Sequence, residues 1–286
     1  MRNTNNLPTV IYTSASERGT IKHVLEAMIK DFRDSRELSW RLFIRDLSAQ
    51  YRQSFFGILW VFVPPIVTST IFILLQSRNI INFGQTDISY PVYVIVGTML
   101  WQIFVDALNA PLKASTNAQA LVAKINFPHE ALLISSFYMV SFNALVKFAI
   151  IVLTLVVFGV SLTWGILLSI PFIFLLILLG LALGTLLTPI GLLYADVASS
   201  LPILVQFAFF VTPVVYPIPT SFPFSLIGVF NPVSPLLISA RDLLTKGMIS
   251  DWMAPLIIAL ITFTLMIMGW FYFRVSLPII IERMSA

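Results

Sequence analysis

The sequence contains no cysteine and little charge. Zero Cys among 286 residues excludes a disulfide scaffold, iron–sulfur ligation and thiol catalysis. Only 10% of the residues are charged, 58% are hydrophobic and the mean hydropathy is +0.93, whereas about a quarter of the residues are charged in a typical soluble domain. Two long tracts, 148–195 and 197–240, hold no charged residue at all. This composition indicates an all-α integral membrane protein with several spans.

The sequence also lacks the usual machinery of an enzyme or an ion-driven carrier. No glycine is followed by lysine, so there is no G-x-x-x-x-G-K loop for nucleotide phosphates. The two histidines, His23 and His129, lie far apart and predict no metal site. Asp106 and Lys147 are too few ionisable groups within the spans for a typical secondary carrier. We therefore expect no catalytic residue, cofactor or metal in this chain, and an energising partner outside it.

Six apolar segments are long enough to cross a bilayer, which takes roughly 20 mostly apolar residues per helix. The expected spans lie near residues 58–76, 91–111, 132–159, 166–191, 200–217 and 253–273. The fourth is the most uniformly apolar. The fifth is short and carries Pro202, Pro213 and Pro217, which membrane helices tolerate where neighbouring helices satisfy the freed carbonyl groups.

The basic residues assign an orientation to these spans. With the N-terminus in the cytoplasm, thirteen of the 17 Lys and Arg residues fall on the cytoplasmic side and three on the outer side. Since short cytoplasmic loops are enriched in Lys and Arg, both termini are expected in the cytoplasm and the protein in the inner (plasma) membrane. The polar N-terminus predicts no cleaved signal peptide. The expected parts are a cytoplasmic segment over 1–36, a six-span domain over 57–275 and a cytoplasmic tail over 276–286.

Residues 37–56 predict an amphipathic helix that lies in the membrane interface. Helical spacing gives it one apolar and one mainly basic face: Trp40, Ile44, Leu47 and Tyr51, against Arg41, Arg45, Ser48 and Arg52. Phe55, Phe56 and Trp60 then fall at the level of the lipid headgroups, where aromatic rings are favoured. The helix is either a general membrane anchor or the frame of a cytoplasmic entrance.

Two short motifs bear on helix geometry. Pro64 and Pro65 lack backbone donors, so we expect them to loosen or kink the first span and shape an entrance there. Gly180 and Gly184 form G-x-x-x-G in the fourth span, which predicts a close-packing face for a neighbouring helix, either inside the bundle or at a dimer interface.

The loop between the second and third spans is a candidate docking site for the energising partner. Its sequence, NAQALVAKINFPHEALL (117–133), predicts a short helix that the Phe-Pro pair ends. A helix with mixed apolar and charged positions can dock in a groove of another protein. The coupling candidates are Asn117, Leu121, Val122, Lys124, Phe127, Pro128 and Glu130. The alternative is an ordinary cytoplasmic loop.

Several motifs, in their order along the chain, resemble those of the permease subunits of ABC transporters of the type-2 (ABC-2) export class. The closest likeness is to exporters of O-antigen and other lipid-linked polysaccharides, with teichoic acid exporters as near relatives. The stretches that carry it are RLFIRDLSAQYRQSFFGILWVFVPPI (41–66), the loop 117–133, YADV (194–197), FVTPVVYPI (210–218) and NPVSPLLISARDLL (231–244). His129 and Ala195 stand where the family usually has Arg.

The resemblance implies a homodimer of six-span subunits with two copies of a separate nucleotide-binding subunit, which binds the ATP and Mg. The loop around 115–130 would be the coupling helix, and 37–56 the interface helix beside a substrate portal. The portal candidates on this helix are Arg41, Arg45, Tyr51 and Arg52. Residues 218–251 would form short re-entrant or interfacial helices on the outer side. The implied partners also include membrane lipids and a lipid-linked polysaccharide substrate, and no nucleic acid.

A polysaccharide pathway would use aromatic side chains, because pyranose rings present apolar faces that suit aromatic rings. The chain has 24 Phe, 8 Tyr and 6 Trp. The pathway candidates are Phe55, Phe56, Trp60, Phe62, Phe207, Phe210, Tyr216 and the mid-span Lys147. Phe207, Phe210 and Val214 are spaced for one helix face. The competing interpretation is that these rings face lipid or the bundle core.

Lys147 is open to two interpretations. It is either a contact to a pyrophosphate or acidic group of the substrate, or a structural polar contact within the bundle, with Asn143 one turn earlier as a hydrogen-bond partner. Asp106 and Asn109 lie near the inner end of the second span. For these two residues we favour a structural role.

The sequence thus predicts the permease subunit of an ATP-driven exporter that moves undecaprenyl-linked, O-antigen-like polysaccharide from the cytoplasmic to the outer side of the membrane. Export of teichoic acid or capsule, or of small amphiphiles such as drugs, is the alternative within the same class. A third hypothesis is an integral-membrane enzyme that acts on polyprenyl lipids. It would need clustered carboxylates, His or Arg at one membrane face, and only the N-terminal segment has such charge density.

Overall fold

The protein is all-helical in the computed structural model, which describes residues 30–52, 57–61, 63–81, 86–119, 128–218 and 230–285. Its elements are α2 (Arg36–Arg52), the 3-10 helix η1 (Gly57–Val61), α3 (Val63–Ser77), α4 (Tyr90–Asn117), α6 (Glu130–Val157), α7 (Gly165–Leu193), α8 (Ala195–Val211), α10 (Val233–Lys246) and α11 (Met253–Ser285). No strand occurs over these ranges, which confirms the all-α prediction.

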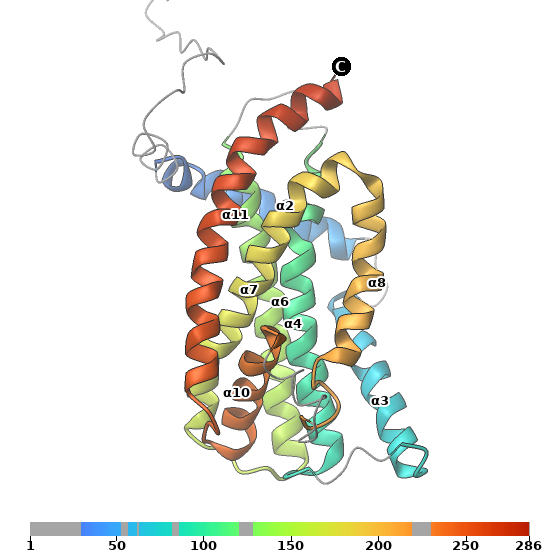
Figure 1. Ribbon diagram of the computed structural model, residues 1–286. Helices are drawn as coiled ribbons and strands as arrows, with labels where there is room; N and C mark the ends of the chain where they lie inside the picture. The colour runs from blue at the N-terminus through green and yellow to red at the C-terminus, as the bar shows by residue number, and fades with distance from the viewer. Residues whose placement is uncertain are drawn as a thin grey trace, which may run out of the picture.

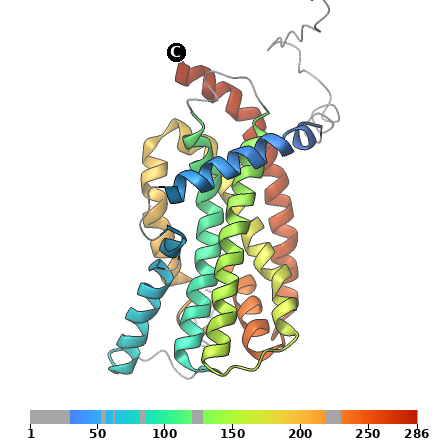
Figure 2. The same ribbon diagram turned by 180° about the vertical axis from the view of Figure 1, so that it is seen from behind.

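The long helices form an elongated bundle. Helix α4 packs against α6 and α7, and α7 packs against α11. Figures 1 and 2 show α3 and α8 at one flank of this bundle. Helix α2 crosses the bundle over α6, near the end that carries the C-terminus, whereas α10 lies against α7 at the opposite end. The end with α2 is the one predicted to face the cytoplasm.

Among the described helices, α4, α6, α7 and α11 are long and apolar enough to cross a membrane. They match the second, third, fourth and sixth expected spans. The first and fifth expected spans correspond to α3 and α8, which are apolar but have only 15 and 17 residues. The chain is therefore a multi-pass membrane protein with four full-length candidate spans in the structure.

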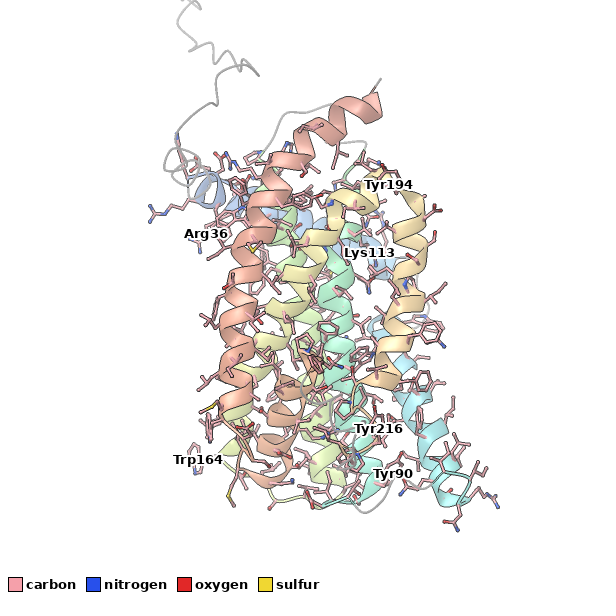
Figure 3. All side chains as sticks on the ribbon, in the orientation of Figure 1. Arg36, Tyr90, Lys113, Trp164, Tyr194 and Tyr216 are labelled. Atoms are coloured by element: carbon pink, nitrogen blue, oxygen red, sulfur yellow. The ribbon has the colours of Figure 1, made fainter. Side chains whose placement is uncertain are left out.

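Exposed aromatic side chains mark both ends of α7. Trp164 precedes its first residue and is 82% exposed, and Tyr194 follows its last residue and is 61% exposed. Figure 3 shows these two side chains at opposite ends of the bundle. Trp and Tyr are enriched at the two membrane–water interfaces, and a 29-residue helix is about 44 Å long, enough to reach from one interface to the other.

The G-x-x-x-G motif lies inside the bundle, where α7 meets α4. A Cβ atom on Gly184 would lie 2.2 Å from the carbonyl oxygen of Leu108, and one on Gly180 would lie 2.6 Å from the Cβ of Ala107. The two glycines therefore let the helix backbones approach closely, as small residues do in membrane bundles. Of the two places considered from sequence, the structure places the motif in the bundle interior.

Replacing Gly184 with Leu should separate α7 from α4 and prevent normal accumulation of the protein. Overpacking a tight interior costs about 1–3 kcal/mol or more, and here the obstacle is backbone rather than a flexible side chain. The measurement is the thermal unfolding midpoint and the monodisperse yield in detergent. Leu167→Ala on the exposed side of α7 (57% exposed) is the control, and equal behaviour of the two variants would contradict the packing assignment.

The double proline begins a helix rather than kinking one. Pro64 and Pro65 occupy the first turn of α3, which starts at Val63, directly after η1. The first backbone N–H groups of a helix have no partner within the helix, so proline is tolerated there. The first expected span is thus divided between the 3-10 helix η1 and the 15-residue α3, with both prolines in the first turn of α3.

The ends of α8 and α11 also differ from the expected spans. Helix α8 begins at Ala195 and ends at Val211, because Thr212 is extended and Pro213 follows it. Val214 therefore lies beyond the helix and is buried, so it does not share a helix face with Phe207 and Phe210. Helix α11 continues to Ser285 through the segment expected to be a tail.

Candidate functional site

A polar cavity of about 440 Å³ lies between α2, η1, the start of α3, α4 and α6. It sits in the half of the bundle that carries α2 (Figure 1). Its lining residues are Phe43, Asp46, Ala49, Gln50, Trp60, Val61, Pro64, Gln102, Asp106, Asn109, Ala110, Lys113, Ala114, Asn117, Ser135, Ser136, Met139, Val140, Asn143 and Lys147. Helices α4 and α6 are strongly apolar overall, and all five amide or charged residues of α4 line this cavity.

The cavity holds an ion pair that joins two of the candidate spans. Lys147 Nζ on α6 donates to Asp106 Oδ2 on α4 at 2.5 Å. The Lys147 side chain is 3% exposed and the Asp106 side chain 33%. Asn143 does not bond Lys147, and its Oδ1 is buried without a hydrogen-bond partner in the structure. An isolated charge in a membrane span is costly, and this pairing offsets the cost for both residues.

Both members of the pair were noted from the sequence, but their contact was not predicted. Residues 106 and 147 lie on different helices, and nothing in the spacing along the chain shows that the two helices place them face to face. The signal that could have found them is the rarity of charge in these spans, since two opposite charges in adjacent membrane helices favour pairing. Lys147 is thus ion-paired with Asp106 within the bundle, and a contact between Lys147 and the substrate stays a prediction.

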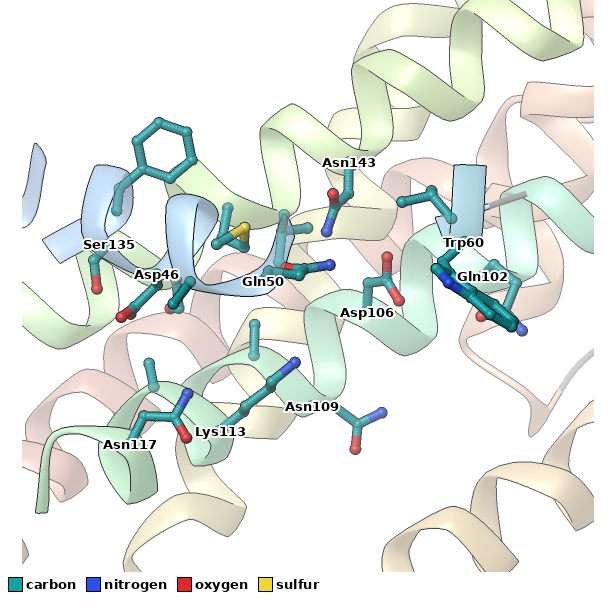
Figure 4. Close-up of a pocket in the computed structure, with 18 of the residues that line it drawn as sticks. Asp46, Gln50, Trp60, Gln102, Asp106, Asn109, Lys113, Asn117, Ser135 and Asn143 are labelled. Carbon is teal, nitrogen blue, oxygen red and sulfur yellow. The ribbon is translucent and has the colours of Figure 1, made fainter. Parts of the chain in front are cut away.

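Amide and hydroxyl groups surround the ion pair. Figure 4 shows Gln102 and Asp106 on α4 near Trp60, with Gln50 and Asn143 approaching from α2 and α6. Of the predicted pathway residues, Trp60 and Lys147 line this cavity. Phe55, Phe56 and Phe62 lie outside the described residues.

The other predicted pathway residues lie away from the cavity. Phe207 and Phe210 are 68% and 57% exposed on α8. Tyr216 lies past the end of α8, and its hydroxyl donates to the carbonyl oxygen of Phe210 at 2.8 Å. Whether Phe207, Phe210 and Tyr216 line a path depends on what covers α8, and their role stays a prediction.

Helix α2 presents two different surfaces. Leu42 and Phe43 are buried against the bundle, whereas Trp40 and Ile44 from the predicted apolar face are 53% and 42% exposed. The Trp40 ring contacts Tyr138 of α6 edge-on and still leaves apolar surface exposed, as Ile44 does, and a helix in the membrane interface needs such surface. Among the portal candidates, Arg41 donates to Glu37 at 2.6 Å and Arg45 to Asp46 at 2.8 Å. Arg52 ends the helix and Tyr51 precedes it.

A second charged cluster lies at the same end of the bundle, beside the predicted coupling loop. Arg274 on α11 bonds Glu130, the first residue of α6, and pairs with Asp31 Oδ2 at 2.7 Å. Glu130 is buried, so its carboxylate is directed into the bundle. Burial, and then the charge of Arg274, lowers the pKa of His129, so this side chain is neutral at pH 7. Of the remaining coupling candidates, Asn117 ends α4, Pro128 precedes His129, and Leu121, Val122, Lys124 and Phe127 lie outside the described residues.

Replacing Arg274 with Met should release the residues before α2 from α11. It leaves Glu130 buried without its cation, and removing one partner of a buried ion pair costs about 3–5 kcal/mol. We expect a lower unfolding midpoint in detergent and faster trypsin cleavage after Lys30 and Arg33. Arg41→Met is the matched control, because its pair with Glu37 is largely exposed and worth at most about 1 kcal/mol. Unchanged cleavage in Arg274→Met would contradict the tethering role.

A third cluster lies at the opposite end and joins two of the motifs that carry the family resemblance. Arg241 on α10 is 4% exposed. Its guanidinium donates to the carbonyl oxygens of Pro213 (3.2 Å) and Val214 (3.0 Å) and lies 3.8 Å from the centre of the Tyr93 ring. Tyr93 in turn donates to the carbonyl oxygen of Tyr216 at 3.0 Å. The stretches 210–218 and 231–244 are therefore bound to each other and to α4.

Nearer the surface at that end, Lys246 pairs with Asp87 at 2.6 Å and with Asp242 at 3.1 Å. The hydrogen bond from Lys246, and then its charge, lowers the pKa of Asp87. These contacts close the edge of α10 against the segment before α4. Over the described part of the chain, no group of three or more His, Cys, Asp or Glu side chains is placed to hold a metal ion.

The fold and the cavity define a multi-pass helical membrane protein with a polar site inside its bundle. Proteins similar to it are export permeases. The chain is 26% identical over 231 residues to the O-antigen export system permease protein RfbA of Myxococcus xanthus, an alignment that covers 78% of this chain and 86% of that protein. Two proteins of the same name from Klebsiella pneumoniae are 27% and 28% identical, over 72% and 71% of this chain and 79% and 78% of theirs. No protein-family model matches the chain.

These relatives confirm the resemblance to O-antigen export permeases of the ABC-2 class that the motifs indicated. The similarity extends over most of the chain in all three alignments, so it concerns the transmembrane domain as a whole rather than one motif. The relatives are described as permease proteins of an export system, which agrees with a transport subunit rather than an enzyme.

Proposed function

We propose that this chain is the transmembrane subunit of an ATP-driven ABC exporter that moves undecaprenyl-linked, O-antigen-like polysaccharide outward across the inner membrane. The observation that carries the proposal is the similarity, over more than two thirds of both chains, to three permeases of O-antigen export systems. The polar cavity inside an otherwise apolar bundle supports it, because such a site serves a hydrophilic ligand and not a wholly apolar one.

The proposed topology has six spans and both termini in the cytoplasm. Helices α3 and α8 are the first and fifth spans. They are shorter than the other four because α3 begins only after η1 and α8 ends at the Thr212-Pro213 step. Two such short helices on one flank suit an assembly in which a second copy of the chain covers them, and their large exposed apolar residues, among them Ile71 and Phe207, need lipid or protein cover.

The proposed mechanism has four steps. A lipid-linked glycan enters from the cytoplasmic leaflet beside α2 and η1. Two copies of a nucleotide-binding subunit, which hold the ATP and Mg, close and push on the loop around 115–130. Because Glu130 directly follows that loop and bonds Arg274, the push reaches α6 and α11 together. The path between two copies of the chain then opens, and the glycan moves outward.

Co-purification tests the transport class. The chain, extracted in mild detergent from its native host, should bring down a protein with nucleotide-binding motifs in a one-to-one ratio, and the complex should hydrolyse ATP. A complex of two copies of each subunit is the expected mass. If the chain is isolated alone and catalyses turnover of a polyprenyl lipid by itself, the exporter hypothesis is contradicted and the protein is a membrane enzyme.

A further inference from the structure

The cavity offers hydrogen bonds in both directions and little net charge. Five amide side chains and two hydroxyls contribute to its walls: Gln50, Gln102, Asn109, Asn117, Asn143, Ser135 and Ser136. The hydroxyls of Ser135 and Ser136 donate within α6 and can still accept, and the amides both donate and accept, as sugar hydroxyls do. A phosphate group at neutral pH mainly accepts hydrogen bonds. The wall chemistry therefore matches a polyol better than an anion.

The charged residues of the cavity are largely neutralised within the protein. Lys147 is paired with Asp106, and Asp46 with Arg45. Lys113 at the rim is the one lining cation for which the described residues record no ion pair. A diphosphate placed among these groups would bring at least two negative charges and find one unpaired cation, so the electrostatics do not favour it inside the cavity.

Two further features suit a sugar ring. Trp60 is 55% exposed and lines the cavity from η1, in the position shown in Figure 4, and an aromatic face packs against the apolar CH face of a pyranose. Asn143 lines the cavity, and its Oδ1 is buried without a hydrogen-bond donor, so a rotation of this amide toward the cavity would let a ligand hydroxyl satisfy a costly unpaired acceptor. The volume of about 440 Å³ lies within the usual range for small-ligand sites, about 300–1,000 Å³.

The position of the cavity indicates which part of the substrate reaches it. It is bordered by α2, the helix predicted to lie in the membrane interface, on which Trp40 and Ile44 leave apolar surface exposed. A glycan whose lipid anchor lies in the same leaflet can place only its lipid-proximal sugars at this depth, because the anchor tethers them there. The rest of the polymer extends beyond the site.

We propose that this cavity, built within one subunit by α2, η1, α4 and α6, binds the lipid-proximal sugar of the glycan before transport. The proposal rests on the proposed function and adds to it a site that recognises the sugar itself. It assigns Gln102, Asn109 and Asn143 to hydroxyl recognition and Trp60 to ring stacking. The Lys147–Asp106 pair holds α4 and α6 in register around them.

The absence of native cysteine permits a direct test. Ala110→Cys places a unique thiol on the cavity wall, and Thr116→Cys places one on the exposed surface of the same helix, outside the cavity. Each variant replaces the native chain in its host, and the surface glycan is scored first. Inverted membrane vesicles without ATP are then treated with a charged, membrane-impermeant thiol reagent. Vesicles from a strain that lacks the enzyme starting the glycan on its lipid serve as the substrate-free reference.

We expect substrate to slow the labelling of Ala110→Cys about tenfold, as occupancy of about 90% would do, and to leave Thr116→Cys unchanged. Adding Gln102→Leu to Ala110→Cys should abolish this protection, whereas Gln206→Leu, an exposed amide-to-leucine change on α8, should not. Equal labelling with and without glycan, in a strain whose surface glycan depends on this chain, would overturn the sugar site and leave the proposed function standing. Surface glycan that does not depend on the chain would instead overturn the proposed function.

Discussion

Replacing Lys147 with Met alone should destabilise the protein more than replacing Lys147 with Met and Asp106 with Leu together. The single change leaves a carboxylate without its cation between two candidate spans, which costs at most about 3–5 kcal/mol; the one-third exposure of Asp106 lowers that figure. The double change replaces a buried pair by apolar side chains, which is often neutral or stabilising. Unfolding midpoints of the wild-type, single and double variants in detergent give the coupling between the two residues.

Lys113→Met is the control for this experiment, because Lys113 is an exposed lysine on the same cavity rim. It should leave the midpoint nearly unchanged. If the unfolding midpoint falls equally in the single and double variants, the interaction between Lys147 and Asp106 does not contribute to stability. Export by the double variant then separates the two interpretations of Lys147: normal export indicates a structural residue, and lost export in a stable protein indicates a substrate contact.

Replacing Arg241 with Met should have the second large effect, a failure of the protein to accumulate. Arg241 is buried, donates to two backbone carbonyls and stacks on Tyr93. Hydrogen bonds from a charged donor contribute about 1.5–3 kcal/mol each, so losing this set removes a large fraction of the stability of a typical protein. The carbonyl of Val214 would remain unpaired, and it is also the group that approaches Gly97 too closely for any side chain there.

The measurement is the monodisperse yield and unfolding midpoint, with Lys246→Met as the matched control five residues along α10. Lys246 is one-third exposed and bonds two carboxylates at the surface, and such pairs are worth about 1 kcal/mol or less. We expect a small shift for Lys246→Met and near-complete loss for Arg241→Met. A normal yield of Arg241→Met would contradict the view that Arg241 holds stretches 210–218 and 231–244 together.

The helices of the bundle could be predicted from sequence because membrane spans are specified locally. A continuous apolar run satisfies its own backbone hydrogen bonds as a helix and needs no partner to be recognised. The expected spans 91–111, 132–159 and 166–191 thus match α4, α6 and α7, each with small shifts at the ends. The close-packing role of Gly184 also followed from a local pattern, since glycine in such a helix has few other uses.

The site could be predicted only in its parts. Trp60 and Lys147 were named as pathway residues, but the cavity also requires Gln50 on α2 and Gln102 and Asn109 on α4, which the spacing along the chain does not connect. Pairings across helices, such as Lys147 with Asp106, depend on helix rotation and register, which no single helix specifies. The position of the prolines could not be predicted for a related reason. Pro64 was expected to kink a span, but α3 begins at Val63 and Pro64 lies in its first turn.

The most direct test of the proposed function is deletion of the gene in the native host, followed by fractionation of the envelope glycans. The account predicts that surface polysaccharide is lost and that undecaprenyl-linked polymer accumulates on the cytoplasmic side, with export restored by the intact chain. Normal surface polysaccharide and no trapped polymer would contradict it, and would move the assignment to a type-2 exporter of small amphiphiles.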